Sequence, residues 1–96
     1  MGAESFVETG KGKTASEAFN YAVGQTQYEH GHGGYSGTLA EKHDFVMISL
    51  PENENAQAYA YDLIEKGDER IDDKWGPAGC IDLGDGKYMF FGWASS

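Results

Sequence analysis

The segment from Tyr28 to Thr38 concentrates groups that can recognise a ligand. Its eleven residues include two tyrosines, two histidines and four glycines. Glycines leave backbone amides accessible to an anion, and tyrosine and histidine rings can stack on flat ligands. One interpretation is a ligand-recognition loop, and the other is a tight turn with its tyrosines in the core. The first interpretation predicts ligand contacts from Tyr28, His30, His32, Gly33, Gly34, Tyr35 and Ser36.

Two lysines stand just before the first expected helix, in the sequence GKGKT at residues 10–14. This sequence is not a phosphate-binding P-loop, because Val7 occupies the position of that motif's first glycine. A helix N-terminus flanked by lysines nevertheless favours anions. Lys11 and Lys13 are therefore predicted to help bind an anionic group, and a solvated turn is the alternative.

Four side chains that can ligate a transition metal are scattered along the chain, at His30, His32, His43 and Cys80. They match the composition of a tetrahedral zinc site, but the spacings C-x-x-C and H-E-x-x-H are missing. We therefore predict neither a metal site nor a cofactor. His30 and His32 leave acid–base catalysis open. Since no sequence motif pairs a nucleophile with a base, the sequence favours a binding protein over an enzyme.

Aromatic residues near the C-terminus suggest two further contact surfaces. Trp75 precedes a glycine–proline pair and is interpreted as a partly buried ring whose edge lines the ligand pocket. On the last expected strand, Phe91 and Trp93 share one face and Phe90 lies on the other. At least one of these rings is expected to be exposed or to lie in an interface. We therefore predict a homodimer through this C-terminal edge strand.

Two segments carry a resemblance to known proteins. YEHGHGGYSGTLAEK at residues 28–42 and DKWGPAGCI at residues 73–81 resemble segments of small, functionally unassigned proteins of tailed phages and bacteria. The resemblance covers 24 of the 96 residues and brings no catalytic residues with it. It implies a phage-type accessory protein, a class that often binds host molecules.

The chain is strongly acidic, with seven basic and 16 acidic residues and a net charge of -9. This charge argues against general DNA or RNA binding. The run of acids between Asp62 and Asp73 is either a solvated helix end or a mimic of a phosphate backbone. No apolar run approaches the roughly 20 residues of a membrane span. The single Cys80 favours a cytoplasmic location, in the host cell if a phage encodes the chain.

Hydrophobic periodicity and turn residues predict one α+β domain over residues 1–96. One helix should begin at Thr14 and fray at residues 28–31. A second should begin at Pro51, after a capping box at Ser49, and end at Lys66. Strands are expected at residues 5–9, 38–42, 45–50, 80–83 and 87–94.

The expected order of these elements is β-α-β-β-α-β-β. Its first six elements match the ferredoxin-like split β-α-β fold, and the last adds an edge strand at the C-terminus. This fold has an antiparallel sheet with two helices on one face. The strand at residues 45–50 is placed centrally, because its apolar run has no polar interruption.

These observations predict a non-enzymatic protein that binds a small polar or nucleotide-like ligand, such as a host immune signal that a phage protein sequesters. Aromatic stacking would supply affinity, and backbone amides and lysines would hold phosphates. Two alternatives remain. One is an acidic inhibitor that uses residues 62–73 against a basic host protein, and the other is a small histidine- or metal-dependent hydrolase.

Overall fold

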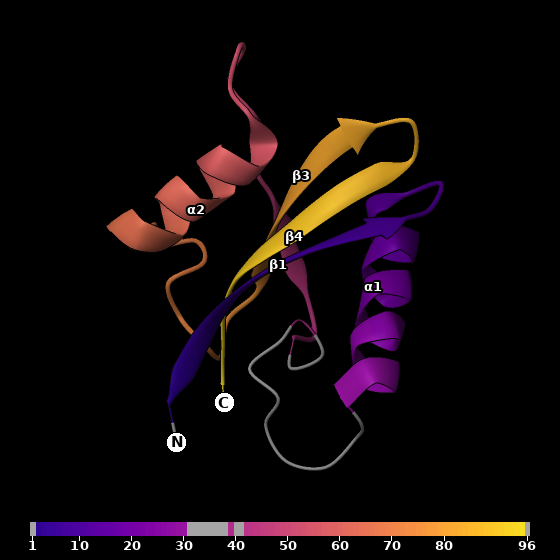
Figure 1. Ribbon diagram of the computed structural model, residues 1–96, viewed down its shortest axis with the longest axis horizontal. Helices are drawn as coiled ribbons and strands as arrows, with labels where there is room; N and C mark the ends of the chain where they lie inside the picture. Colours follow the sequence, from indigo (N-terminus) through magenta and orange to yellow (C-terminus); the bar gives the residue numbers. More distant parts are fainter. Residues whose placement is uncertain (1, 31–38, 40–41, 96) are drawn as a thin grey trace.

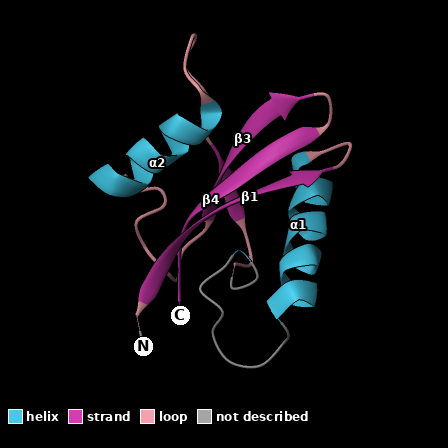
Figure 2. Ribbon diagram, viewed as in Figure 1, coloured by secondary structure: helices cyan, strands magenta, loops and turns pink. Residues whose placement is uncertain are grey.

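The computed structural model describes residues 2–30, 39 and 42–95, without the side chains of residues 27, 29, 30 and 95. These residues form an α+β fold with two helices and a four-stranded sheet (Figures 1 and 2). The elements in chain order are β1 (Ala3–Lys11), α1 (Ala15–His30), β2 (Phe45–Met47), α2 (Ala56–Lys66), β3 (Ala78–Gly84) and β4 (Lys87–Ser95).

The sheet is mixed and has the strand order β1-β4-β3-β2. Strand β4 is antiparallel to both of its neighbours, whereas β2 is parallel to β3. The prediction of an antiparallel, ferredoxin-like sheet was therefore wrong. The C-terminal strand is also not an edge strand, because β1 and β3 pair with its two sides. The predicted homodimer through that strand thus loses its structural basis, since β4 has no unpaired edge.

The two helices cover opposite faces of the sheet (Figure 1). Helix α1 packs on one face in the α1-side core, and helix α2 packs on the other face in the α2-side core. Phe90 belongs to the first core and Phe91 to the second. The main helical members are Ala18, Phe19 and Ala22 for the α1-side core, and Ala60, Leu63 and Ile64 for the α2-side core. The expectation that both helices share one face was therefore wrong.

The connections between strands explain this arrangement. Strands β1, β2 and β3 run in the same direction, because β4 is antiparallel to both β1 and β3. The connection through α1 crosses the sheet from β1 to β2, and the connection through α2 returns from β2 to β3. Crossovers between parallel strands are nearly always right-handed. Two crossovers of the same hand that run in opposite directions place their helices on opposite faces.

The aromatic residues of β4 alternate as the sequence predicted, but none of the three is exposed. Phe90 and Phe91 are completely buried on opposite faces. Trp93 is half-buried and packs against the α2-side core. The expectation of an exposed ring or a ring in an interface assumed one open face, whereas a helix covers each face of this sheet.

The ends of the helices follow local capping chemistry. The predicted start of the first helix is confirmed, because the Thr14 hydroxyl accepts a hydrogen bond from the amide of Glu17 at 3.2 Å. The second helix starts later than predicted. Its N-cap is Asn55, whose side chain accepts a hydrogen bond from the Ala58 amide at 3.0 Å, and it ends at Gly67 in a left-handed conformation.

Two predicted strands differ from the structure. The strand placed at residues 45–50 is shorter and lies at the sheet edge, as β2. Its apolar run fits this position because Phe45 packs against the α1-side core while Met47 remains half exposed. Of the strand expected at residues 38–42, the structure describes Leu39 and Lys42, and neither is in a strand. The other three residues lie outside the described part of the chain.

Close packing between β1 and α1 requires a glycine at position 10. A β-carbon at Gly10 would lie 2.4 Å from the carbonyl oxygen of Ala18 and 3.0 Å from the β-carbon of Ala22. Both distances are shorter than van der Waals contact. Gly10 of the GKGKT sequence therefore serves helix–strand packing. By contrast, Gly24 lies on α1, and a β-carbon added there would have nothing within 4 Å.

We predict that Gly10→Ala lowers the free energy of unfolding by about 2 kcal/mol or more, because the added methyl group overpacks the α1 contact. The matched control is Gly24→Ala, which should raise the free energy of unfolding by about 1 kcal/mol, because alanine favours an exposed helix position. Urea unfolding of both variants measures the difference. Equal effects of the two substitutions would contradict the packing role of Gly10.

Candidate functional site

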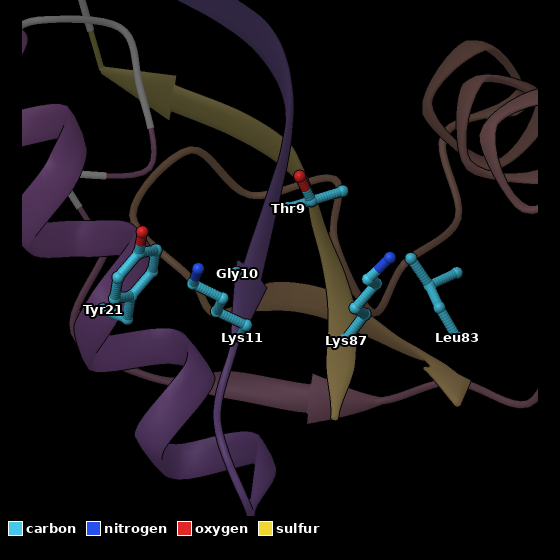
Figure 3. Close-up of a pocket in the computed structure, with 6 residues that line it drawn as sticks. All are labelled: Thr9, Gly10, Lys11, Tyr21, Leu83 and Lys87. Carbon is cyan, nitrogen blue, oxygen red and sulfur yellow. The ribbon is translucent and has the colours of Figure 1, made fainter. Parts of the chain in front are cut away.

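A pocket of about 370 Å³ lies at one end of the sheet, where β1 ends and β4 begins (Figure 3). Residues from three strands and from α1 line it: Thr9, Gly10, Lys11, Tyr21, Leu83 and Lys87. The parallel strands β1 and β3 have their carboxyl ends at this end of the sheet. Ligands of open α/β sheets commonly bind at the carboxyl ends of strands.

Two lysines dominate the charge of this pocket. Lys11 and Lys87 are directly paired across β1 and β4. Lys11 reaches toward helix α1, where its Nζ lies 5.6 Å from the centre of the Tyr21 ring, while Lys87 extends on the side of Leu83 (Figure 3). Within the described residues, neither lysine has a carboxylate at salt-bridge distance. The pocket is therefore a local site of positive charge in an acidic protein.

Lys13, the second lysine predicted to bind an anion, lies beside this pocket but does not line it. It is exposed in the turn between β1 and α1. The preceding residue, Gly12, donates its amide to the carbonyl of Gly86 in the β3–β4 hairpin at 2.9 Å. That bond fixes the turn against the hairpin that leads into Lys87.

Lys87 and Tyr21 were not predicted as members of this pocket. Lys87 follows the Gly84-Asp85-Gly86 turn, which is a readable hairpin signal. Its pairing with Lys11 depends on the long-range alignment of β1 with β4, which no local pattern reveals.

A second, smaller hollow lies at the other end of the sheet. It has a volume of about 200 Å³, and its lining residues are His43, Asp44, Trp75, Gly76 and Pro77. Trp75 is 65% exposed, so the indole is more exposed than the partial burial predicted from the sequence. Its amide donates to the Asp73 carboxylate at 2.8 Å, and Lys74 Nζ lies 5.4 Å from the centre of its ring.

Lys42 fixes the loop that carries Trp75. The residue is only 3% exposed, and its Nζ donates to the carbonyl oxygens of Asp73, Lys74 and Gly76 at 3.3, 3.1 and 2.8 Å. Burial lowers the pKa of Lys42 to about 8, and the nearby Asp73 carboxylate partly opposes that shift. Lys42 was not identified from the sequence, because a lysine is rarely expected to be buried.

The two ends of the sheet separate residues that were predicted to share one site. Lys74, the neighbour of Trp75, donates from Nζ to the carbonyl of Gly2 at 3.2 Å, just before β1 begins. Lys11 lies at the other end of β1, nine residues after Gly2. At about 3.3 Å per residue this is roughly 30 Å. The structure therefore does not bring Lys11 and Trp75 together in one compact site.

Most of the glycine-, histidine- and tyrosine-rich segment lies outside the described residues. This holds for His32, Gly33, Gly34, Tyr35 and Ser36. Tyr28 is on α1 and is 89% exposed. His30 is the last residue of α1, and the structure does not describe its side chain. A ligand-recognition loop at this position stays a prediction.

Cys80 lies in a chemically inert environment. It is completely buried in the α1-side core, and this burial raises the pKa of its thiol to about 12. Within the described part of the chain, no three histidine, cysteine or acidic side chains are grouped to hold a metal ion. Of the four ligands considered for a zinc site, His32 and the side chain of His30 lie outside that part.

Two members of the acidic run are paired with neighbouring basic residues. Asp68 receives hydrogen bonds from both Nε and Nη2 of Arg70 at 2.9 Å, which lower the pKa of Asp68 to about 2. Asp62 lies 3.6 Å from Lys66 one turn away on α2. Both pairs are on the surface, as expected of a solvated helix end.

Comparisons with protein-family models, with curated proteins and with solved structures find no match to this chain. Neither of the described helices is long and apolar enough to span a membrane.

The lowered pKa of Lys42 predicts a pH dependence of stability. Between about pH 8 and the usual lysine pKa near 10.5, the unfolded chain holds a proton on Lys42 that the folded chain has lost. The contribution of Lys42 to the free energy of unfolding should therefore increase as the pH rises from 8 to 10. Chemical unfolding of the natural chain and of Lys42→Met at both pH values measures this. A difference between the two proteins that shrinks with rising pH would contradict it.

The burial of Cys80 predicts that its thiol reacts only after unfolding. In the folded protein at pH 8, a disulfide reagent should modify it at a rate at least a hundredfold below that of the urea-unfolded chain, because the thiolate is scarce and shielded. Absorbance of the released thiol reports the rate. Rapid modification of the folded protein would show that Cys80 is accessible to substrates or metals.

Proposed function

We propose that this protein is a non-enzymatic binding protein whose pocket at Lys11 and Lys87 holds a small anionic, nucleotide-like ligand. The observation that supports this most strongly is the direct pairing of two lysines across adjacent strands. Like charges opposite each other in a sheet destabilise it. An acidic side chain at either position would remove that cost, and the chain is rich in acids. A bound anion removes it as well.

The surroundings of the two lysines favour a phosphate that is attached to an organic group. Thr9 and Tyr21 provide hydroxyl groups, and Leu83 provides an apolar wall. The Lys11 ammonium now lies over the ring of Tyr21. A phosphate between the lysines would attract that ammonium, and the face of Tyr21 would then become available to stack on a base or another flat group.

The biological setting that we propose is sequestration. A phage-type accessory protein of this kind would act in the host cytoplasm and hold a nucleotide-like immune signal without breaking any bond in it. This part of the proposal is supported by the resemblance of the segments at residues 28–42 and 73–81. The positively charged pocket is consistent with it.

Isothermal titration calorimetry with phosphate-bearing probes tests the pocket. The probes are inorganic phosphate, a nucleoside monophosphate and a cyclic dinucleotide, with the uncharged nucleoside for comparison. We expect at least one phosphate-bearing probe to bind more tightly than the nucleoside. Lys11→Gln and Lys87→Gln should each weaken that binding about tenfold, or about 1.4 kcal/mol, because each removes one charged contact.

The matched control is Lys66→Gln, which removes the same charge from an exposed position on α2 outside the pocket. It should leave binding unchanged within twofold. The proposal fails if no phosphate-bearing probe binds. It also fails if Lys66→Gln weakens binding as much as the two pocket variants, since the effect would then reflect net charge alone.

A further inference from the structure

Three of the seven basic side chains of this protein lie together at the end of the sheet that carries the lysine pocket. Each of the other four is held by a carboxylate or a backbone carbonyl: Lys42, Lys66, Arg70 and Lys74. Lys11, Lys13 and Lys87 have no carboxylate at salt-bridge distance among the described residues. In a chain with 16 acidic residues, the positive charge without an acidic partner is thus gathered in one place.

The turn that carries Lys13 is packed closely against its neighbours. Gly12 donates its amide to the carbonyl of Gly86 at 2.9 Å, and a β-carbon at Gly12 would lie only 2.7 Å from the amide nitrogen of Ala18. The backbone next to Lys13 is therefore held between the hairpin that leads into Lys87 and the start of α1. This packing keeps Lys13 beside the pocket, although its side chain does not line it.

Lys13 is close enough to the pocket to contact the neighbour of a phosphate bound there. It follows Lys11 by two residues, so the two Cα atoms are at most about 7 Å apart. Its side chain is exposed and forms no ion pair with Glu17, the acid four residues further on. A lysine ammonium is a point charge on a flexible stem. It is therefore available to a group joined directly to a phosphate that lies between Lys11 and Lys87.

We propose that the ligand of this pocket carries a diphosphate, that is, two phosphate groups joined directly, as in a nucleoside diphosphate. Lys11 and Lys87 hold the phosphate nearer the organic group, and Lys13 holds the outer one. A monophosphate would leave Lys13 without a partner, and phosphates kept apart by sugars would place the second one farther from it. This inference rests on the proposed function of the pocket and adds the number and spacing of the phosphates.

Isothermal titration calorimetry of the full chain with adenosine monophosphate and adenosine diphosphate tests the number of phosphates. We expect the diphosphate to bind about fivefold more tightly or better, because its outer phosphate gains a charged contact with Lys13. Inorganic phosphate and pyrophosphate repeat the comparison without a base. A cyclic dinucleotide, whose two phosphates are separated by sugars, tests the spacing.

Substitution of Lys13, an exposed residue, should affect the outer phosphate alone. Lys13→Gln should leave the affinity for adenosine monophosphate unchanged within twofold and reduce the advantage of the diphosphate to less than twofold. Lys13→Arg should keep most of that advantage, because arginine retains the charge. The matched control Lys66→Gln removes an equal charge outside the pocket and should preserve the advantage. Lys11→Gln should weaken the binding of both nucleotides.

The inference is overturned, and the proposed function stands, if the monophosphate binds through Lys11 and Lys87 but the diphosphate binds no more tightly. It is also overturned if the advantage of the diphosphate survives Lys13→Gln, or if Lys66→Gln reduces that advantage as much. Weaker binding of the cyclic dinucleotide to Lys13→Gln, with no effect on the diphosphate, would show that the two phosphates are separate. If no phosphate-bearing probe binds, the inference and the proposed function both fail.

Discussion

Strand β4 imposes the main constraint on this fold, because two adjacent phenylalanines on it must be buried on opposite sides. Phe90 contacts Phe19 and Phe45 at ring-centre distances of 5.4 and 5.8 Å in the α1-side core. Phe91 fills the α2-side core. A strand with large apolar side chains on both faces must have a layer on each face. One helix on each side of a sheet centred on β4 and β3 satisfies this requirement with only two helices.

This layering determines where a ligand can bind. Since a helix covers each face, the strand ends remain as open surface in the described part of the molecule. Both hollows lie there, one at the carboxyl ends of β1 and β3 and the other near the amino ends of β2 and β3. Their chemistry differs because the charges differ. The first places two lysines together, and the second has Asp44 beside an indole.

Local sequence signals predicted most of the elements but not their arrangement. The Thr14 cap, the stop at Gly67 and the hairpin at residues 84–86 were readable because their causes lie within a few residues. The start of α2 was misplaced because Ser49 and Glu52 imitate a capping box, whereas Asn55 is the residue that caps the helix. The apolar run at residues 45–50 indicated a buried strand, but burial on two faces does not distinguish a central strand from an edge strand.

The candidate site was harder to predict, because its residues come together only through the pairing of distant strands. Lys11 was identified from its own neighbours, but its partner Lys87 depends on the β1–β4 register. Lys42 had no local signal at all, since its role requires three carbonyls more than 30 residues away in the chain. Trp75 was noticed as an aromatic residue beside Gly76 and Pro77. The sequence did not show the distance between Trp75 and the lysines, because that distance depends on how the strands are arranged.

That distance limits what a single small ligand can contact. The extended strand β1 separates Lys11 from the loop of Trp75 by roughly 30 Å, which is far longer than a mononucleotide. One small ligand therefore cannot place its phosphate on Lys11 and Lys87 and its base on Trp75. A base that accompanies a phosphate in the lysine pocket must stack on Tyr21, the aromatic residue that lines it.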